Sequence, residues 1–140
     1  GILQAMDAAG NNSFVASVRK FGRSTAQTAA VASVTTYTLP ATDGTFEVSA
    51  NVLVTTSTVH SFTVTVAYTD EGNTARTLTL PFVSLAGTAL TAIANAAGAV
   101  PYEGIPVHIR AKASTAITIA TTGTFTTVTY NVEGIIRQMQ

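Results

Sequence analysis

Threonine and apolar residues alternate along much of this chain, most clearly from Phe62 to Thr69. Successive side chains of a β-strand point to opposite faces, so this alternation predicts a strand with one packed apolar face and one threonine face in water. The alternation recurs in segments 46–52, 77–80, 117–119 and 128–132. No helical periodicity of any length accompanies it. The pattern therefore predicts an all-β protein.

Turn-forming residues separate the apolar segments at roughly ten-residue intervals, which is typical of sandwiches and barrels. Asp70–Asn73 and Thr121–Thr124 have the composition of tight hairpin turns. We expect about eight strands, near residues 31–39, 44–56, 59–69, 74–84, 87–93, 104–113, 115–121 and 124–138. These features predict an antiparallel β-sandwich, jelly-roll-like, with an extended N-terminal arm.

The phase of the alternation predicts which side chains form the core. The buried face is expected to comprise Phe46, Val48, Val52, Val54, Phe62, Val64, Val66, Tyr68, Leu78, Leu80, Phe82, Ile105, Val107, Ile109, Ile117, Ile119, Phe125, Val128, Tyr130 and Val132. Leu53 and Val59 fall on the outer face. Isolated outward apolar residues are normal, whereas clustered ones would mark a subunit contact.

Residues 1–28 differ from the rest of the chain, because they are small and polar and hold its one cluster of cations. We expect them to form an N-terminal arm, with the β-sandwich domain at 29–140. Residues 13–21 fit either a short strand or a turn of helix. An arm that docks on a platform or a neighbouring subunit explains these features as well as a frayed terminus does.

Charge is sparse in this sequence: 10% of the residues are charged, against roughly 25% in ordinary soluble domains. Threonine takes their place, at 26 of 140 residues, and keeps exposed strand faces hydrated. A weakly charged surface does little to repel neighbouring copies, which favours a homo-oligomer over a plain monomer. The zero net charge and the lack of a basic stripe argue against a nucleic-acid partner. No apolar run is long enough to span a membrane, and there is no cysteine.

Candidate chemistry is hard to find. His60 and His108 lack the spacing of metal ligands, and no nucleophile elbow or phosphate-binding loop occurs. His60 is expected at a strand start, on an edge or rim, and His108 on the outer face beside Arg110. Asp70, with Glu71 and Asn73, suits an ordinary hairpin tip better than a calcium site. We therefore expect no enzyme activity, metal or cofactor.

A sugar site is the one binding function that the residues leave open. Tyr102, in the expected loop 101–104, is placed to contact a ligand, and Glu103 could accept hydrogen bonds from sugar hydroxyls. The other reading is that Tyr102 covers the open end of the sandwich.

From residue 31 onward, the order of features resembles a β-sandwich family that is common in structural proteins of tailed bacteriophages. The resemblance is carried by the segments Tyr37–Pro40, Phe62–Thr77, Ala116–Gly123 and Val128–Ile136. Such modules are similar to head fibres, capsid decoration proteins and tail-spike or baseplate domains, which typically assemble as trimers. The resemblance implies a location in the virion, and it offers no catalytic residues to carry over.

Two functions of different class follow. The first is a non-enzymatic capsid decoration or stabilising protein (cement or head-fibre) that docks as a homo-oligomer, with a trimer favoured, on the major capsid protein or another virion protein. Its platform-binding arm is expected to use Ile2, Leu3, Phe14, Arg19, Lys20 and Arg23. The alternative is a tail-fibre or baseplate receptor-binding module that recognises a host glycan through Tyr102 and Glu103. The low aromatic content of the expected loop tips favours the first.

Overall fold

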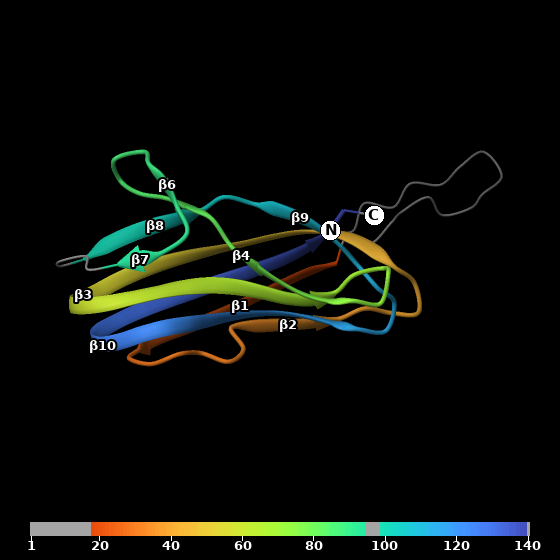
Figure 1. Cartoon of the computed structure of the whole chain (residues 1–140), viewed down its shortest axis with the longest axis horizontal. Coiled ribbons are helices and arrows are strands. Elements are labelled where there is room, and N and C mark those ends of the chain that lie inside the picture. Colours follow the sequence, from red (N-terminus) through yellow and green to blue (C-terminus); the bar gives the residue numbers. More distant parts are fainter. Residues whose placement is uncertain (1–17, 95–98, 140) are drawn as a thin grey trace, which may run out of the picture.

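The computed structural model describes residues 18–94 and 99–139. This part of the chain forms ten β-strands, linked by antiparallel pairings into a single sheet (Figure 1). The strands are β1 (Arg19–Gln27), β2 (Thr35–Thr38), β3 (Gly44–Thr69), β4 (Ala75–Thr79), β5 (Phe82–Val83), β6 (Ala89–Leu90), β7 (Ile93–Ala94), β8 (Val100–Gly104), β9 (Val107–Ala111) and β10 (Ala116–Gln138). The expectation of an all-β, antiparallel fold is confirmed. Within the described ranges there is no helix of the length and apolarity that crossing a membrane requires.

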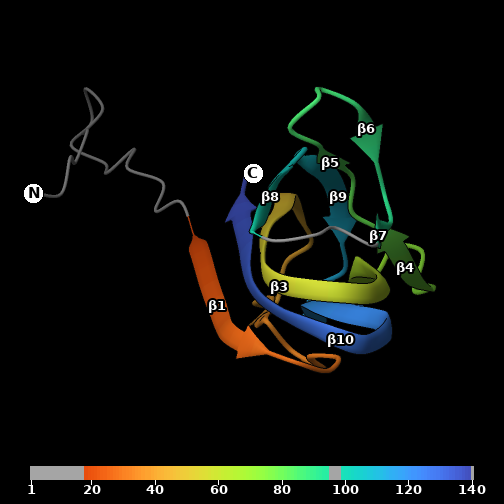
Figure 2. The same ribbon diagram turned by 90° about the vertical axis from the view of Figure 1, so that its left-hand side faces the viewer.

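Two long strands, β3 and β10, form the framework of the molecule. They pair over nearly their whole lengths, from Phe46 opposite Gln138 to Ala67 opposite Thr118. Figure 2, an end-on view, shows that this pair curls strongly, and the short strands β5 to β9 lie across its open side. Each half of β3 therefore has its own outer neighbours: β9 and β8 pair with the first half, and β7 and β4 with the second. On β10 the first half pairs with β2 and the second with β1.

The expected breaks inside β3 and β10 are wrong, because each of these is one continuous strand. The Thr121–Thr124 segment, expected to be a hairpin turn, lies within β10. Gly123 has φ of 142°, and a Cβ there would lie 2.4 Å from the carbonyl oxygen of Ser61. The register with β3 then shifts between Thr124 and Thr127. A glycine followed by an irregular register bends a strand without ending it.

Strand pairing already begins at Arg19, within the segment 1–28 that was expected to form an arm. Strand β1 pairs with β10 from Arg19 opposite Arg137 to Gln27 opposite Tyr130. Its outward residues are exposed, so the sequence lacks the apolar alternation of a buried strand. Residues 1–17 lie outside the described part of the chain.

Smaller differences concern the segments that cover the open side. The expected strand 74–84 is divided into β4 and β5, 87–93 into β6 and β7, and 104–113 gives way to β8 and β9. The turn at 70–73 is confirmed: the Asn73 amide donates to the Asp70 carbonyl at 2.9 Å, and Asn73 has a positive φ of 64°. The Thr74 amide also donates to Oδ1 of Asp70 at 2.9 Å. This side-chain bond holds the turn closed.

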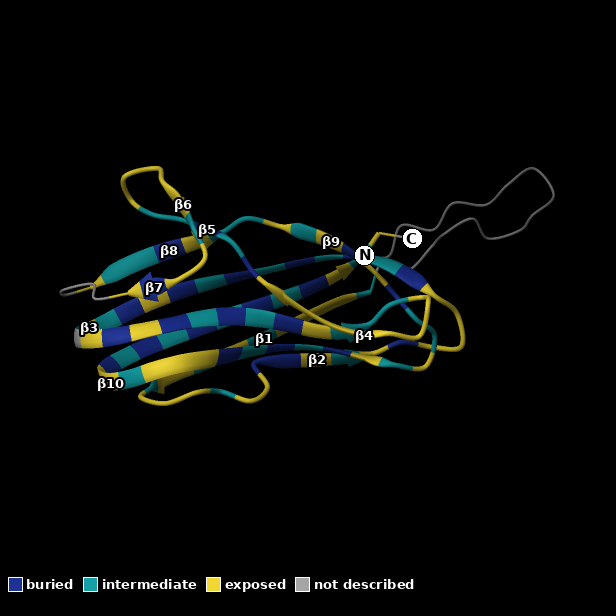
Figure 3. Cartoon of the chain, viewed as in Figure 1, coloured by how far each residue is buried: buried dark blue, intermediate teal, exposed yellow. Residues whose placement is uncertain are grey.

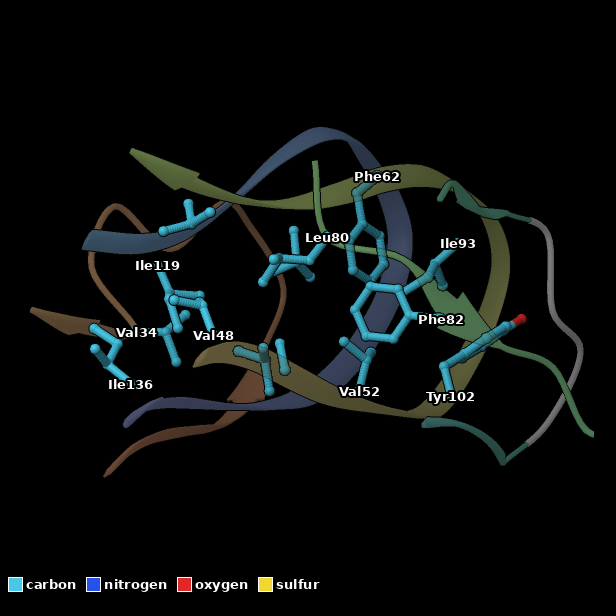
Figure 4. Packing of buried hydrophobic residues seen from close by; sticks show 14 of the residues in the cluster. Val34, Val48, Val52, Phe62, Leu80, Phe82, Ile93, Tyr102, Ile119 and Ile136 are labelled. Carbon is cyan, nitrogen blue, oxygen red and sulfur yellow. The ribbon is translucent and has the colours of Figure 1, made fainter. Parts of the chain in front are cut away.

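The core lies between the curled strand pair and the short strands. Buried and less buried residues alternate along β3 and β10 (Figure 3), as the threonine pattern predicts. Figure 4 shows two ends of this core: Phe62, Phe82 and Ile93 gather at one, and Val34, Val48, Ile119 and Ile136 at the other. The sequence pattern missed Val34, Leu39, Ala50, Ile93, Tyr102, Ala111 and Ile136.

Leu78, expected in the core, is 38% exposed. The reason is that β4 lies at the margin of the sheet, where all five of its residues are exposed. Leu53 and Val59 are exposed, as the phase of the alternation predicts.

Candidate functional site

The residues expected to bind a platform fall into two groups. Arg19, Lys20 and Arg23 lie on β1 and are exposed. Ile2, Leu3 and Phe14 lie outside the described residues.

The expected ligand loop is wrong in its local structure. Residues 101–104 belong to β8, and Tyr102 is 7% exposed because it pairs with Val52 on the core side of β3. Burial raises the pKa of the Tyr102 phenol, so the hydroxyl stays protonated at neutral pH. Its neighbour Glu103 points the other way and is exposed. The alternation of a strand thus points the side chains of these two residues to opposite sides of β8, although both residues border the groove described below.

Strand register brings a set of outward side chains together on the half of the sheet that contains β1. We call this surface the β1 face. It comprises Arg19, Phe21 and Arg23 of β1; Asn131, Glu133, Ile135 and Arg137 of β10; Glu47, Ser49, Asn51 and Leu53 of β3; Pro101 and Glu103 of β8; and His108 of β9. It unites Arg19 and Arg23 of β1 with Glu103, whereas Lys20 points to the other side of the strand.

One end of the β1 face is basic. Oε2 of Glu47 lies 3.2 Å from Nη2 of Arg137 and 3.4 Å from Nε2 of His108. Arg19 lies opposite Arg137 on the neighbouring strand and adds a further positive charge. Phe21 occupies the adjacent row and is 50% exposed. The end of the face at which β1 begins therefore combines cations with an exposed aromatic ring.

The other end of the β1 face holds a groove. It has a volume of about 340 Å³ and is lined by Arg23, Asn51, Val52, Leu53, Pro101, Tyr102, Glu103, Asn131 and Glu133. Nε of Arg23 lies 3.5 Å from Oε1 of Glu133, and the two side chains are 53% and 33% exposed. A pair this exposed contributes little to stability, and its groups are available to a ligand.

Two asparagines fix the sides of this groove. Oδ1 of Asn51 accepts a hydrogen bond from the Gly104 amide at 2.9 Å, which holds β8 against β3. Oδ1 of Asn131 accepts one from the Ala26 amide at 2.8 Å, which holds β1 against β10 at a point where their register shifts. Among the described residues, neither Nδ2 atom has a hydrogen-bond partner. Both amide groups can therefore donate to a ligand.

The groove offers donors from amide and guanidinium groups and acceptors from two carboxylates, above the apolar Leu53 and Pro101. This chemistry suits a neutral ligand that carries several hydroxyl groups, or a polar peptide segment. Sequence reasoning found Arg23 and Glu103 but missed the asparagines. Their signal was available, because Asn is depleted in strands and both residues interrupt threonine-rich strands at outward positions.

A second cavity, of about 490 Å³, lies at the end of the sheet near the register shifts of β10. Its lining is mostly hydroxyl-bearing: Thr28, Thr56, Ser57, Phe125, Thr126, Thr127, Val128 and Thr129. Oγ of Ser57 also shares a hydrogen bond with Nδ1 of His60. The described residues contain no group of three or more His, Cys, Asp and Glu side chains that could hold a metal ion.

His60, expected at a rim, is 1% exposed. Because β3 continues through residues 57–59, His60 has the same core-facing phase as Phe62, and the two rings lie 5.7 Å apart. Burial lowers the pKa of its imidazole. His108, by contrast, is exposed on β9 as expected.

We expect the free energy of unfolding to fall as the pH drops below 6.5, the ordinary pKa of histidine. The folded state holds His60 neutral, so below that pH the unfolded state binds more protons than the folded state does. The contribution is complete above pH 6.5 and is lost as the pH falls through the lower folded pKa. Urea unfolding of wild type and H60Q between pH 7.5 and about 5, above the range where carboxylates titrate, measures it. Equal pH slopes for the two proteins would contradict the prediction.

No protein-family model matches this chain. No curated protein matches it either. Among solved structures, it is similar to the N-terminal CBM22-1 and GH10 modules of Clostridium thermocellum endo-1,4-β-D-xylanase 10B, crystallised with xylohexaose, at 14% identity and a TM-score of 0.35. The match covers 74% of this chain and 18% of that chain, so this chain spans less than a fifth of its length. At this TM-score we infer neither fold nor function from it.

Proposed function

We propose that this chain is a non-enzymatic structural protein of a tailed-phage virion, namely a capsid decoration or stabilising protein that docks as a homo-oligomer. The partner surface is the major capsid protein or another virion protein, and the docking surface is the β1 edge together with the residues that precede it. The family resemblance favours a trimer and a jelly-roll-like sandwich. No reaction has to be catalysed in this role, since attachment alone adds buried area across subunit boundaries.

The observation that carries the proposal is the position of β1. Among the described strands, β1 pairs only with β10, so its other edge presents backbone groups to which a strand of another protein can bind. Arg19, Lys20 and Arg23 make this edge basic, and Phe21 supplies an exposed aromatic anchor. Antiparallel pairing with a second β1 centred on Phe21 would set Arg19 opposite Arg23, which is repulsive. The edge therefore suits an acidic strand of a different protein.

Arg19→Glu is expected to weaken attachment to the particle by at least tenfold, because it reverses one of the charges that meet the acidic partner. The variant should fold normally, since the new carboxylate lies opposite Arg137 and replaces a like-charged pair by an attractive one. Binding to particles that lack the protein is measured by quantitative mass spectrometry against the major capsid protein. Lys112→Glu, the same charge change in the turn between β9 and β10, is the control and should bind as wild type does.

Copy number in purified particles tests the assignment itself. Hundreds of copies per particle would support a decoration protein, and absence from particles would refute a virion role. Equal binding by the Arg19 and Lys112 variants would instead refute docking through β1 and leave the virion role standing.

A second candidate function is a tail-fibre or baseplate module that binds a host glycan. The groove of the β1 face favours it, since exposed Glu103 and Glu133 accept hydrogen bonds and two asparagine amides donate them. A few to a few dozen copies per particle would point to this function, and calorimetric titration with neutral oligosaccharides would then test the groove directly.

A further inference from the structure

The half of the sheet that lacks β1 carries a second outward face, built almost entirely from threonine and alanine. We call it the threonine face. It comprises Thr36 and Thr38 of β2; Ala116, Thr118, Ala120, Thr122 and Thr124 of β10; Ser61, Thr63, Thr65, Ala67 and Thr69 of β3; and Ala75, Thr77 and Thr79 of β4. Strand register places these residues in rows four strands wide, such as Thr36, Thr118, Ala67 and Thr77.

The rest of the described chain leaves this face uncovered. All of its residues are exposed or half-buried, whereas Val64, Val66, Ile117 and Ile119, which point to the opposite side of the same strands, are fully buried. The alternation is therefore between core and surface, and none of the described residues forms a second layer over this face.

The threonine face carries no charge. The chain has seven Lys and Arg residues and seven Asp and Glu residues, and apart from Asp7, which lies outside the described part, all of them lie elsewhere. No side chain on the face is larger than threonine. Depletion of charge is the compositional mark of an interface core. A surface that only met water would have no reason to exclude charge over four strands.

Hydroxyl chemistry makes this face complementary to itself. A threonine hydroxyl both donates and accepts a hydrogen bond, so one copy of the face can bond to another without any matching of charges. Only one bond joins two side chains within the face, at 3.2 Å between Oγ1 of Thr36 and Oγ1 of Thr118. The other hydroxyls remain available to a partner.

The size of the face also suits a second copy. Nine residues of strand span about 30 Å and four strands about 15–19 Å, which gives a footprint on the order of 500 Å². Two such faces in contact bury about 1,000 Å² in total, the lower limit for a specific interface. Small side chains let two sheets approach closely and pack face to face.

We infer that the threonine face is a contact between two copies of this chain, related by a two-fold axis. The same patch serves both subunits, as an isologous contact requires. The inference takes from the proposed function only the expectation of a homo-oligomer, and it puts a two-fold dimer in place of the trimer that the family resemblance favours. It also leaves the β1 edge of each copy free for a different partner.

Light scattering after size exclusion tests the inference on the full chain. Wild type is expected at twice the 14.4 kDa chain mass, and Thr65→Lys at the single chain mass, with dimer affinity at least 100-fold weaker because the new charge would be buried at the centre of the contact. Ser49→Lys, the matched control, lies on the same strand but on the β1 face, and should remain dimeric. A monomeric wild type, or a Thr65→Lys dimer, would overturn the inference.

Cysteine cross-linking keeps the test decisive if Thr65→Lys fails to fold. The chain has no cysteine, so single variants T65C, A67C, T118C and A120C each introduce one thiol near the centre of the face. At least one is expected to give a disulfide-linked dimer on mild oxidation, and S49C should not. If none of the four variants forms a cross-link, the threonine face is not the contact between subunits. A trimer that persists in Thr65→Lys would likewise exclude the threonine face as the contact. The proposed homo-oligomer, and the docking measured with Arg19→Glu, would still stand.

Discussion

Replacing Tyr130 by alanine is expected to lower the free energy of unfolding by about 4 kcal/mol. Tyr130 is fully buried on β10, and its ring lies 4.7 Å from that of Phe62 and 5.5 Å from that of Phe125. The substitution removes one ring of this aromatic cluster, and the surrounding long strands cannot collapse into the space. Urea unfolding followed by circular dichroism measures the loss.

The hydroxyl of Tyr130 has a separate role that Tyr130→Phe isolates. It donates to the carbonyl of Ala29 at 2.6 Å, so the hydroxyl of Thr121 is left to donate to Tyr130, over 2.8 Å. Oγ1 of Thr121 in turn accepts from the Val31 amide at 2.8 Å. This network ties the segment between β1 and β2 to the middle of β10. We expect Tyr130→Phe to cost about 1–2 kcal/mol, since it breaks the chain of bonds while the ring remains.

A double-mutant cycle with Thr121→Val checks that the two hydroxyls act together. If they do, the double variant loses less than the sum of the single losses, by more than about 0.5 kcal/mol. Tyr37→Phe is the control, because Tyr37 is only half-buried and should lose little. A Tyr130→Phe variant as stable as wild type would show that the network contributes nothing.

The sequence pattern predicts which side chains of β3 and β10 are buried, but it does not predict that each of these strands is continuous. Strand β10 shows why. Its buried residues are odd-numbered at Ile117 and Ile119 but even-numbered at Val128 and Tyr130. A change of phase like this arises either from a turn or from a bulge in one strand. Which of the two forms depends on the partner, and β3 runs through without interruption opposite Gly123. That information is non-local, so the alternation within β10 cannot contain it.

The candidate site was harder to predict for the same reason. The groove of the β1 face joins Arg23, Asn51, Glu103 and Glu133, which come from four strands far apart in the sequence. Their proximity follows from the register of β1 on β10 and of β10 on β3. Tyr102 was misplaced because Pro101 and the glycine-containing segment before it have the composition of a loop, although Pro101 itself lies in β8.

Gly22→Ala is expected to displace β1 and to lower the free energy of unfolding by about 3 kcal/mol. A Cβ on Gly22 would lie 2.1 Å from the carbonyl oxygen of Val34 and 2.5 Å from Cβ of Thr35. Neither contact can be relieved by rotating a side chain, so β1 or the start of β2 must move. Because β1 is an edge strand, we expect it to yield while the pairing of β3 with β10 persists.

Amide hydrogen exchange distinguishes this local displacement from global destabilisation. Protection should fall in β1 and remain in β3, because local opening releases an edge before the core. Gly72→Ala is the control, since a Cβ there would meet only Oδ1 of Asp70, at 3.2 Å in an exposed turn. If docking occurs through the β1 edge, Gly22→Ala should also lose particle attachment although it changes no charge. If the variant attaches fully although the amides of β1 have lost their protection, docking does not require β1 to be paired in the sheet. The cations at the start of β1 would then remain as the docking contacts.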